Sequence, residues 1–251
     1  MNKWMHGFTT VSLLEFKGAE LGSVRRWISS LANPVAYLCF LGVGLAAQFG
    51  GVSYLGFMLP GVIVIQATSS MSAMIYRAVL ERRWGLGALK LQAGIAPSAY
   101  LTGMLSAPVC LYVLRVLVLL VIAALLSVLV NAGAWLLGVL VSLLAMGFWS
   151  LLGIIVAAFL KDYRTRDFVV GLIMTPLMFA APTFYSLDAA PVVLKVIASV
   201  NPLTYQVELL RAVMAGGLDL TALIVSVVLL LAAAAVSRLC IGSMRELAFE
   251  A

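Results

Sequence analysis

Six long apolar stretches dominate this sequence and leave few folds open to it. They cover residues 28–49, 54–76, 99–130, 134–160, 168–185 and 218–237. A helix needs about 20 residues, each rising about 1.5 Å, to cross the hydrocarbon core of a bilayer. Only helices and closed barrels satisfy their backbone hydrogen bonds there, and runs of this length fit helices. The sequence therefore predicts an all-α integral membrane protein with six transmembrane helices in a single domain, residues 1–251.

The composition supports this interpretation. Apolar residues make up 64 % of the 251 residues and charged residues 10 %, and the mean hydropathy is +1.13. Soluble domains carry about 25 % charged residues. The runs are too many for a cleavable leader, and we expect none to be removed. The three cysteines and the single histidine, His6, lack the paired spacing of a disulfide framework or metal site, so we expect neither.

The distribution of basic residues predicts an orientation. Lys and Arg accumulate on the cytoplasmic side of membrane proteins. If the N-terminus is cytoplasmic, thirteen of the sixteen basic residues fall on that side: Lys3, Lys17, Arg25, Arg26, Arg77, Arg82, Arg83, Lys90, Lys161, Arg164, Arg166, Arg238 and Arg245. Lys195 and Arg211 fall outside, and Arg115 lies within the third run. We therefore expect both termini in the cytoplasm, a multi-pass protein among membrane lipids, and no binding to nucleic acid.

Two polar segments are expected to lie at the cytoplasmic face. Residues 1–27 are too polar to cross a bilayer and have the spacing of an amphipathic helix lying on the membrane, although a frayed tail is the alternative. Residues 77–98 hold the densest cluster of charge in the chain. They form either a solvated loop that only sets topology or a short interfacial helix on which a soluble partner pushes. In the second case we expect the contacts to be made by Glu81, Arg82, Arg83, Trp84 and Leu89.

Residues 186–217, between the fifth and sixth runs, break the pattern of spans. An apolar stretch of ten residues, 191–200, is too short to cross, and Asn201-Pro202 separates it from a second helical stretch, 203–214. This predicts a re-entrant helical hairpin on the outer face, with a plain extracellular loop as the alternative. In the hairpin case we expect an outer gate built from Asn201, Pro202, Tyr205, Glu208 and Arg115. Arg115 either pairs with Glu208 or Asp188 or extends to the interface.

The second run contains a polar belt around Gln66. Small residues such as these allow close helix packing in lipid. The alternative is that Gln66, Ser70 and Met74 form one face of a substrate path, continued at its outer end by Phe179, Phe184 and Tyr185.

An energy source is missing from the sequence. It contains no GxxxxGK[ST] phosphate-binding loop, and its spans lack the clustered carboxylates of proton- or sodium-coupled carriers. No HExxH motif and no Ser-His or Cys-His pairing occurs, and the single histidine lies near the N-terminus, so we expect no protease chemistry within the membrane. We therefore expect no catalytic residue, no metal and no cofactor on this chain.

Several short motifs carry a family resemblance that covers essentially the whole chain. They are, in order, 33–37 (NPVAY), 81–85 (ERRWG), 94–98 (GIAPS), 182–185 (PTFY), 201–205 (NPLTY) and 209–211 (LLR). With these the chain resembles the permease subunit of an ABC type-2 exporter, and it is most similar to permeases for nodulation lipo-oligosaccharides and for daunorubicin-type drug efflux. It departs from the family's usual wording at Gly87-Ala88-Leu89-Lys90, where more acidic residues are expected.

The resemblance implies a function. It implies a dimer of two permease copies, a separate ATPase dimer that holds ATP and Mg, an N-terminal interface helix and a coupling helix between spans two and three. The cargo would be amphipathic or lipidic: a glycolipid, a lipo-oligosaccharide or a hydrophobic drug. A stand-alone channel or secondary carrier, or a non-transporting membrane scaffold, are the alternatives, and they would work without a partner ATPase.

Overall fold

A computed structural model describes residues 3–19, 23–49, 51–128, 131–160, 163–188 and 190–247. These residues are mostly helical, and no strand occurs among them. In chain order the elements are α1 (Lys3–Gly18), α2 (Val24–Ala36), the π-helix η1 (Tyr37–Gly42), α3 (Val43–Phe49), α4 (Val52–Arg83), α5 (Leu86–Gln92), α6 (Pro97–Leu125), α7 (Ala132–Phe159), α8 (Tyr163–Ala180), α9 (Val192–Ser199), α10 (Pro202–Met214) and α11 (Leu220–Leu247).

Five stretches in the described residues are long and apolar enough to span a membrane. They are Trp27–Ala47, Ser53–Arg83, Pro97–Leu125, Ala132–Phe159 and Leu220–Ile241. The fifth apolar run forms α8, whose apolar part, Val170–Ala180, is shorter than these. The all-α membrane fold is thus confirmed, and a sixth crossing at α8 stays a prediction.

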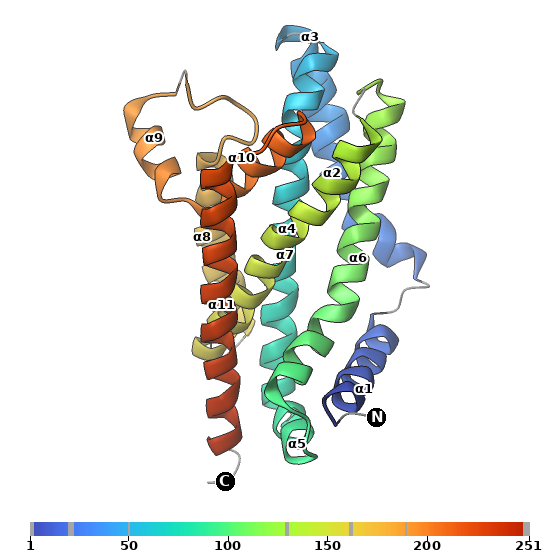
Figure 1. Ribbon diagram of the computed structural model, residues 1–251, viewed down its shortest axis with the longest axis vertical. Helices are drawn as coiled ribbons and strands as arrows, with labels where there is room; N and C mark the ends of the chain where they lie inside the picture. Colours follow the sequence, from blue (N-terminus) through green and yellow to red (C-terminus); the bar gives the residue numbers. More distant parts are fainter. Residues whose placement is uncertain are drawn as a thin grey trace.

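The long helices form one bundle, with α4 and α7 side by side at its centre (Figure 1). Their backbones approach closely at Gly153, where an added Cβ would lie 2.6 Å from the carbonyl oxygen of Met71. Such contacts hold helices together in lipid, where burial of apolar surface gives no driving force. The main core cluster includes buried residues of α4, α6 and α7.

The two ends of the bundle differ (Figure 1). The short helix α5, the N-terminal helix α1 and the C-terminal end of α11 lie at one end, and α3 and α9 lie at the other. We call the first the charged end, because α1 and α5 lie there together with the basic C-terminal turn of α4, which holds Arg82 and Arg83. Lys161 and the side chains of Arg26, Arg164, Arg166 and Arg245 lie outside the described part of the structure.

Local sequence explains where several helices begin and bend. Pro97 and Pro202 stand in the first turns of α6 and α10, where a missing N–H costs no hydrogen bond. The Asn131 side chain accepts a hydrogen bond from the Gly133 N–H at 2.9 Å and so caps α7. Pro34 interrupts the hydrogen bonding of α2, and the wider π-helical turns of η1 follow it.

The second span is longer than the sequence predicts. We expect a helix over 54–76 and a polar loop from Arg77, but α4 continues to Arg83. It continues because Arg77, Glu81 and Arg82 all find partners in neighbouring helices, described below. Gly85, with φ +67°, then turns the chain into α5.

Candidate functional site

Glu81 is the centre of a polar cluster at the charged end. Lys90 Nζ of α5 donates to Glu81 Oε1 at 2.5 Å, and Tyr100 Oη of α6 donates to Glu81 Oε2, also at 2.5 Å. The ammonium of Lys90 also lies 5.5 Å from the centroid of the Tyr100 ring. Glu81 is only 6 % exposed. It therefore holds α5 against α4 and α6 and is not itself available to a soluble partner.

A second ion pair joins the N-terminal helix α1 to α4. Arg77 Nη2 lies 2.6 Å from Glu15 Oε2 on the buried face of α1. Burial raises the pKa of Glu15 above its usual value, although the neighbouring Arg77 opposes the shift. α1 is thereby fixed to α4 as well as to α6, along which it packs.

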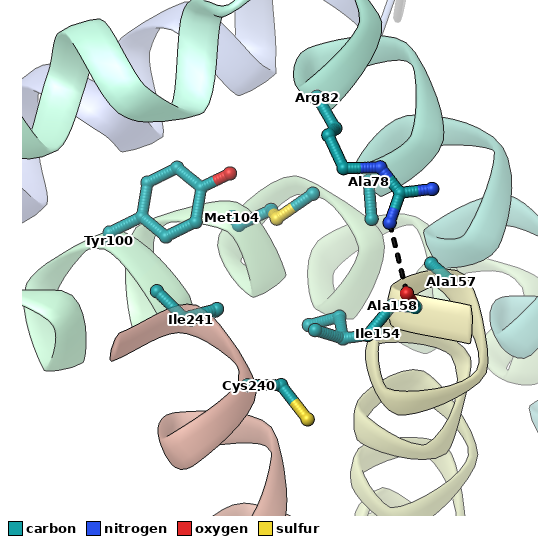
Figure 2. A pocket seen from close by; sticks show the side chains of 9 residues that line it. All are labelled: Ala78, Arg82, Tyr100, Met104, Ile154, Ala157, Ala158, Cys240 and Ile241. Carbon is teal, nitrogen blue, oxygen red and sulfur yellow. Dashed lines mark hydrogen bonds between the residues drawn. The ribbon is translucent and has the colours of Figure 1, made fainter. Parts of the chain in front are cut away.

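Arg82 joins α4 to α7. Its Nη1 donates to the carbonyl oxygen of Ala158 at 3.1 Å, and its Nη2 donates to that of Leu160. These carbonyls lie at the C-terminal end of α7, where a cation also stabilises the helix dipole. Figure 2 shows Arg82 beside a small pocket that residues of α4, α6, α7 and α11 line. At about 20 Å³ this pocket has room for a single water and none for a substrate.

The remaining residues predicted to contact a partner are exposed. Arg83 is exposed, Trp84 is 63 % exposed, and Leu89 is 60 % exposed. Leu86, which the sequence did not single out, is exposed beside them. These four residues form an exposed apolar surface with one positive charge, made by the last residue of α4, the turn that follows it and α5; we call it the α5 tip.

Gln66 lines a polar pocket between α2, α4 and α8. The pocket has a volume of about 250 Å³. Its polar lining residues are uncharged: Asn33, Gln66, Thr68, Ser69, Ser72 and Thr175. Gln66 is 6 % exposed and its side-chain amide makes no hydrogen bond to a described residue. The prediction that Gln66 faces a path is compatible with this placement.

Ser70 and Met74 lie against α7 and are not among the described residues that line this pocket. Ser70 Oγ donates within its own helix to Ala67 at 2.5 Å and lies 3.3 Å from the carbonyl oxygen of Met146 in α7. Met74 is fully buried and faces Gly153 of α7. Residues four positions apart are neighbours on a helix surface, but here Ser70 contacts α7 whereas Gln66 lines the pocket that α8 also borders. Both side chains therefore pack the bundle.

A larger cavity with aromatic walls, the aromatic cavity, lies toward the end of the bundle opposite the charged end. It has a volume of about 590 Å³, and α3, α4, α9 and the segment before α9 line it. Tyr54, Phe57, Phe184 and Tyr185 supply its aromatic walls, so two of the three residues predicted for the outer path do meet here. Phe179 is exposed on α8 and lines neither this cavity nor the polar pocket.

Side chains of α4 and α10 hold the segment that follows α8. Tyr54 Oη donates to the carbonyl oxygen of Phe184 at 2.9 Å, and Arg211 Nη2 donates to that of Pro182 at 2.7 Å. The guanidinium carbon of Arg211 also lies 3.9 Å from the centroid of the Phe57 ring, a cation–π contact. Tyr54 and Arg211 thus bind carbonyl oxygens of the segment that follows α8, and Phe57 positions the guanidinium of Arg211.

The hairpin residues predicted as an outer gate have mixed placements. α9 and α10 are two short helices joined at Asn201, as predicted. Asn201 Oδ1 accepts from the Leu203 N–H at 3.0 Å, and its Nδ2 donates to the Leu177 carbonyl oxygen at 2.7 Å, so Asn201 caps α10 and ties it to α8. Pro202 begins α10. Tyr205 Oη donates to the Ser199 carbonyl oxygen at 2.7 Å, which fixes it within the hairpin and not beside Phe184.

The predicted charge pairing of the hairpin is absent. Among the described residues Glu208 forms no ion pair with Arg115 or Arg211, and Arg115 Nε is buried without a hydrogen-bond partner. Arg211 instead uses Phe57 and Pro182. Arg115 stays half-buried on α6, with exposed Leu114 and Leu117 on either side of it.

Comparison with known proteins places this arrangement in a family. The profile of a family described as ABC-2 type transporter matches residues 16–215, a range that includes α4, α5, the polar pocket and the hairpin. The chain belongs to this family. It is an ABC-2 permease, a membrane transport protein.

Relatives of this ABC-2 permease include named proteins. It is 28 % identical to Nodulation protein J of Rhizobium leguminosarum bv. viciae, over 81 % of this chain and 79 % of the relative. It is 25 % identical to Nodulation protein J of Rhizobium meliloti, over 81 % and 78 %. It is 23 % identical to the inner membrane transport permease YadH of Escherichia coli, over 74 % and 75 %.

Sequence reasoning missed the partners that make the ABC-2 permease's charged end rigid. Arg77 and Glu81 stand four residues apart at the end of an apolar helix, a spacing that places both on one face. The other available signal was Glu15, a carboxylate in the amphipathic N-terminal helix that could have been expected to pair with a basic residue. Which of these charges would meet could not be read from spacing, because α1, α5 and α6 approach α4 from different directions.

Proposed function

We propose that this ABC-2 permease is the membrane subunit of an exporter driven by ATP, with the ATPase on separate polypeptides that bind ATP and Mg. The α5 tip carries this proposal. Trp84, Leu86 and Leu89 expose apolar surface beside a cluster of charges that belongs in water. Trp and Arg, which this tip combines, are among the residue types that dominate the binding energy of protein–protein contacts.

The hydrogen bonds that hold α5 to its neighbours explain how movement of the ATPase would be transmitted from the α5 tip to the membrane helices. α5 is anchored through Lys90 to Glu81, which also binds Tyr100 of α6. Arg82, one residue further along, binds the end of α7. Displacement of the tip by an ATPase dimer would therefore move α4, α6 and α7 together. Glu81 and Arg82 serve in this proposal as internal anchors, and Arg83, Trp84 and Leu89 make the contact.

The substrate path in this proposal begins at the polar pocket. Gln66, Ser69 and Asn33 lie on helices whose other faces meet apolar neighbours, and unpaired polar groups facing lipid are costly. A second copy of the chain placed across this face would enclose the pocket as a path, in a homodimer. The cargo would be amphipathic or lipidic and would leave the cytoplasm or inner leaflet.

The exit would lie at the aromatic cavity. Tyr37 lines the polar pocket, Phe184 lines the aromatic cavity, and their ring centroids are 6.0 Å apart. This pair stands between the two spaces. We place the charged end, and with it both termini, in the cytoplasm of a bacterial cell, and α9 with the aromatic cavity at the outer face of its inner membrane.

The test is co-purification of an ATPase from the native host. Full-length tagged protein extracted in mild detergent should bring with it a P-loop ATPase and ATP hydrolysis. The double variant Trp84→Ala with Leu89→Ala should insert normally but retain roughly thirtyfold less ATPase, since an anchor at such a contact contributes about 2 kcal/mol.

A matched control is available on the opposite end of the bundle. Leu136 and Leu137 are also exposed leucines, at the start of α7. Leu136→Ala with Leu137→Ala should leave ATPase recovery unchanged. Full ATPase recovery with the tip variant, or transport by the purified chain without any ATPase, would refute the proposal.

A further inference from the structure

The polar pocket has a chemistry that restricts what can occupy it. Thr68 Oγ1 donates to the carbonyl oxygen of Ile65 at 2.8 Å and Ser69 Oγ to that of Gln66 at 2.7 Å. Each hydroxyl has used its only hydrogen on its own helix, so toward the pocket it offers lone pairs. Gln66 and Asn33 add amides with two N–H donors and an acceptor each.

Gln66 is the residue that points to a ligand. Its side chain is more than nine-tenths buried, lines the pocket and makes no hydrogen bond to a described residue. Its amide atoms are not enclosed by protein and so reach the space of the pocket, where a ligand group could be their hydrogen-bond partner. The missing partner must bring both a donor and an acceptor to satisfy a primary amide.

The described lining of this pocket is free of charge. None of its described residues carries a group that is charged at neutral pH, and the charges of α4 begin only at Arg77, beyond the pocket. An ion that entered would lose its hydration and meet no opposite charge, which is strongly unfavourable in a low-dielectric site. Hydroxyl and amide groups suffer no such loss, because the lining can replace the water they give up.

We infer that the pocket around Gln66 binds the uncharged, hydroxyl- or amide-bearing head group of an amphiphile and excludes phosphate-bearing and cationic amphiphiles. This inference rests on the proposed function for its biological meaning, since it names the class of cargo that the path would admit. The other walls, Pro34, Tyr37, Met174 and Met178, are apolar or aromatic and suit the hydrocarbon that adjoins such a head group.

The test measures binding without ATP or a partner. The full-length protein in lipid nanodiscs is incubated with a photoactivatable dodecyl glucoside, irradiated and mapped by mass spectrometry. Label is expected on α2, α4 and α8 around the pocket. Competitors with the same chain are dodecyl maltoside, dodecyl phosphate and dodecyltrimethylammonium, and the neutral competitor should displace the label at about tenfold lower concentration than either ion.

Variants of Gln66 assign the effect to one side chain. Gln66→Leu should reduce labelling about tenfold, because the head group loses its amide partner. Gln66→Glu preserves the shape, and at pH 8 it should improve displacement by dodecyltrimethylammonium. Ser142→Ala is the matched control: Ser142 is a buried hydroxyl in α7 that donates to Val139 at 2.8 Å and does not line the pocket, so labelling should not change.

The outcomes separate this inference from the function on which it rests. Equal displacement by all three competitors, or unchanged labelling of both Gln66 variants, would overturn the inference while ATP-driven transport by the complex could still stand. Selective labelling of a protein that recruits no ATPase would support the inference and overturn only the proposed function. Melting temperatures of each variant in the nanodisc show whether lost labelling reflects unfolding. If Gln66→Leu unfolds, the displacement of label from Gln66→Glu by dodecyltrimethylammonium tests the inference in its place.

Discussion

Glu15 shows how a single residue can fix the position of a whole helix. Its carboxylate is buried on α1 and reaches Arg77 of α4 at 2.6 Å, while Glu15 Oε1 has no hydrogen-bond partner. A buried ion pair adds little stability by itself, but removal of one partner leaves an uncompensated charge. The attachment of α1 to the bundle is therefore destabilised if Arg77 is removed, because the buried charge of Glu15 is then uncompensated.

This condition predicts a pH-dependent defect in Arg77→Ala. Without the guanidinium, burial alone acts on Glu15, whose pKa is already raised in the folded protein. A carboxyl with a raised folded-state pKa stabilises the fold below its unfolded pKa and loses that contribution as pH rises through the folded value. Arg77→Ala should cost about 3 kcal/mol at pH 8 and recover stability as pH falls toward 5. Melting temperatures in detergent across this range measure it.

The companion variant is Arg77→Ala with Glu15→Gln. It removes the charge that would otherwise be buried alone, so its melting temperature should exceed that of Arg77→Ala at pH 8 and vary less with pH. If Arg77→Ala is as stable at pH 8 as at pH 5, Arg77 does not compensate the charge of Glu15.

At the level of elements, α1 is held to α6 by close packing of small residues. An added Cβ at Gly103 would lie 2.7 Å from Val11 Cβ, nearer than atoms tolerate, and Trp4 Nε1 donates to Ser98 Oγ at 3.1 Å. The sequence predicted an amphipathic helix on the membrane surface. The structure shows that its buried face, including Val11 and Glu15, rests on protein.

The contact predicts a disulfide between the two helices. An added Cβ at Gly7 would lie 3.5 Å from Ala99 Cβ, within the range of about 3.5–4.5 Å that a disulfide requires. In a background without Cys39, Cys110 and Cys240, Gly7→Cys with Ala99→Cys should cross-link readily under mild oxidation. A shift in electrophoretic mobility after cleavage between the two helices reports the bond.

Adding Gly103→Leu to this pair should suppress the cross-link, because the larger side chain pushes Val11 and α1 away. Gly44→Leu is the matched control, since nothing lies within 4 Å of a Cβ added at Gly44. Cross-linking that is equally efficient with Gly103→Leu would contradict the close packing of α1 on α6.

At the scale of the whole molecule, the apolar runs were enough to predict an all-α membrane fold, but they do not show which side chains meet in the candidate site. Run length and proline positions located the helices because each span must satisfy its own backbone in lipid. Residues whose role depends on a neighbour could not be placed in this way. Ser70 and Gln66 look alike in the sequence and face different helices, and Glu81 looks exposed until Lys90 and Tyr100 cover it.

The number of crossings is the largest prediction still to be tested, and two exposed residues are enough to test it. Leu89 lies on the α5 tip and Asp188 precedes α9, so both are accessible to a maleimide when replaced by cysteine. Between them run α6, α7 and α8. If all three cross, Leu89 and Asp188 lie on opposite sides of the membrane; if α8 turns back, they lie on the same side.

We expect six crossings, with the charged end in the cytoplasm because most basic residues favour that side. In a chain without native cysteines, Leu89→Cys should react with a membrane-impermeant maleimide only in inverted vesicles, and Asp188→Cys only in intact spheroplasts. α8 has eighteen residues, which at about 1.5 Å each reach nearly the thickness of the hydrocarbon core, and the clamped segment at Pro182 adds the remainder. Reaction of both cysteines in the same preparation would show five crossings. It would also place the aromatic cavity, whose wall includes Phe184, on the ATPase side, where it could not serve as an exit.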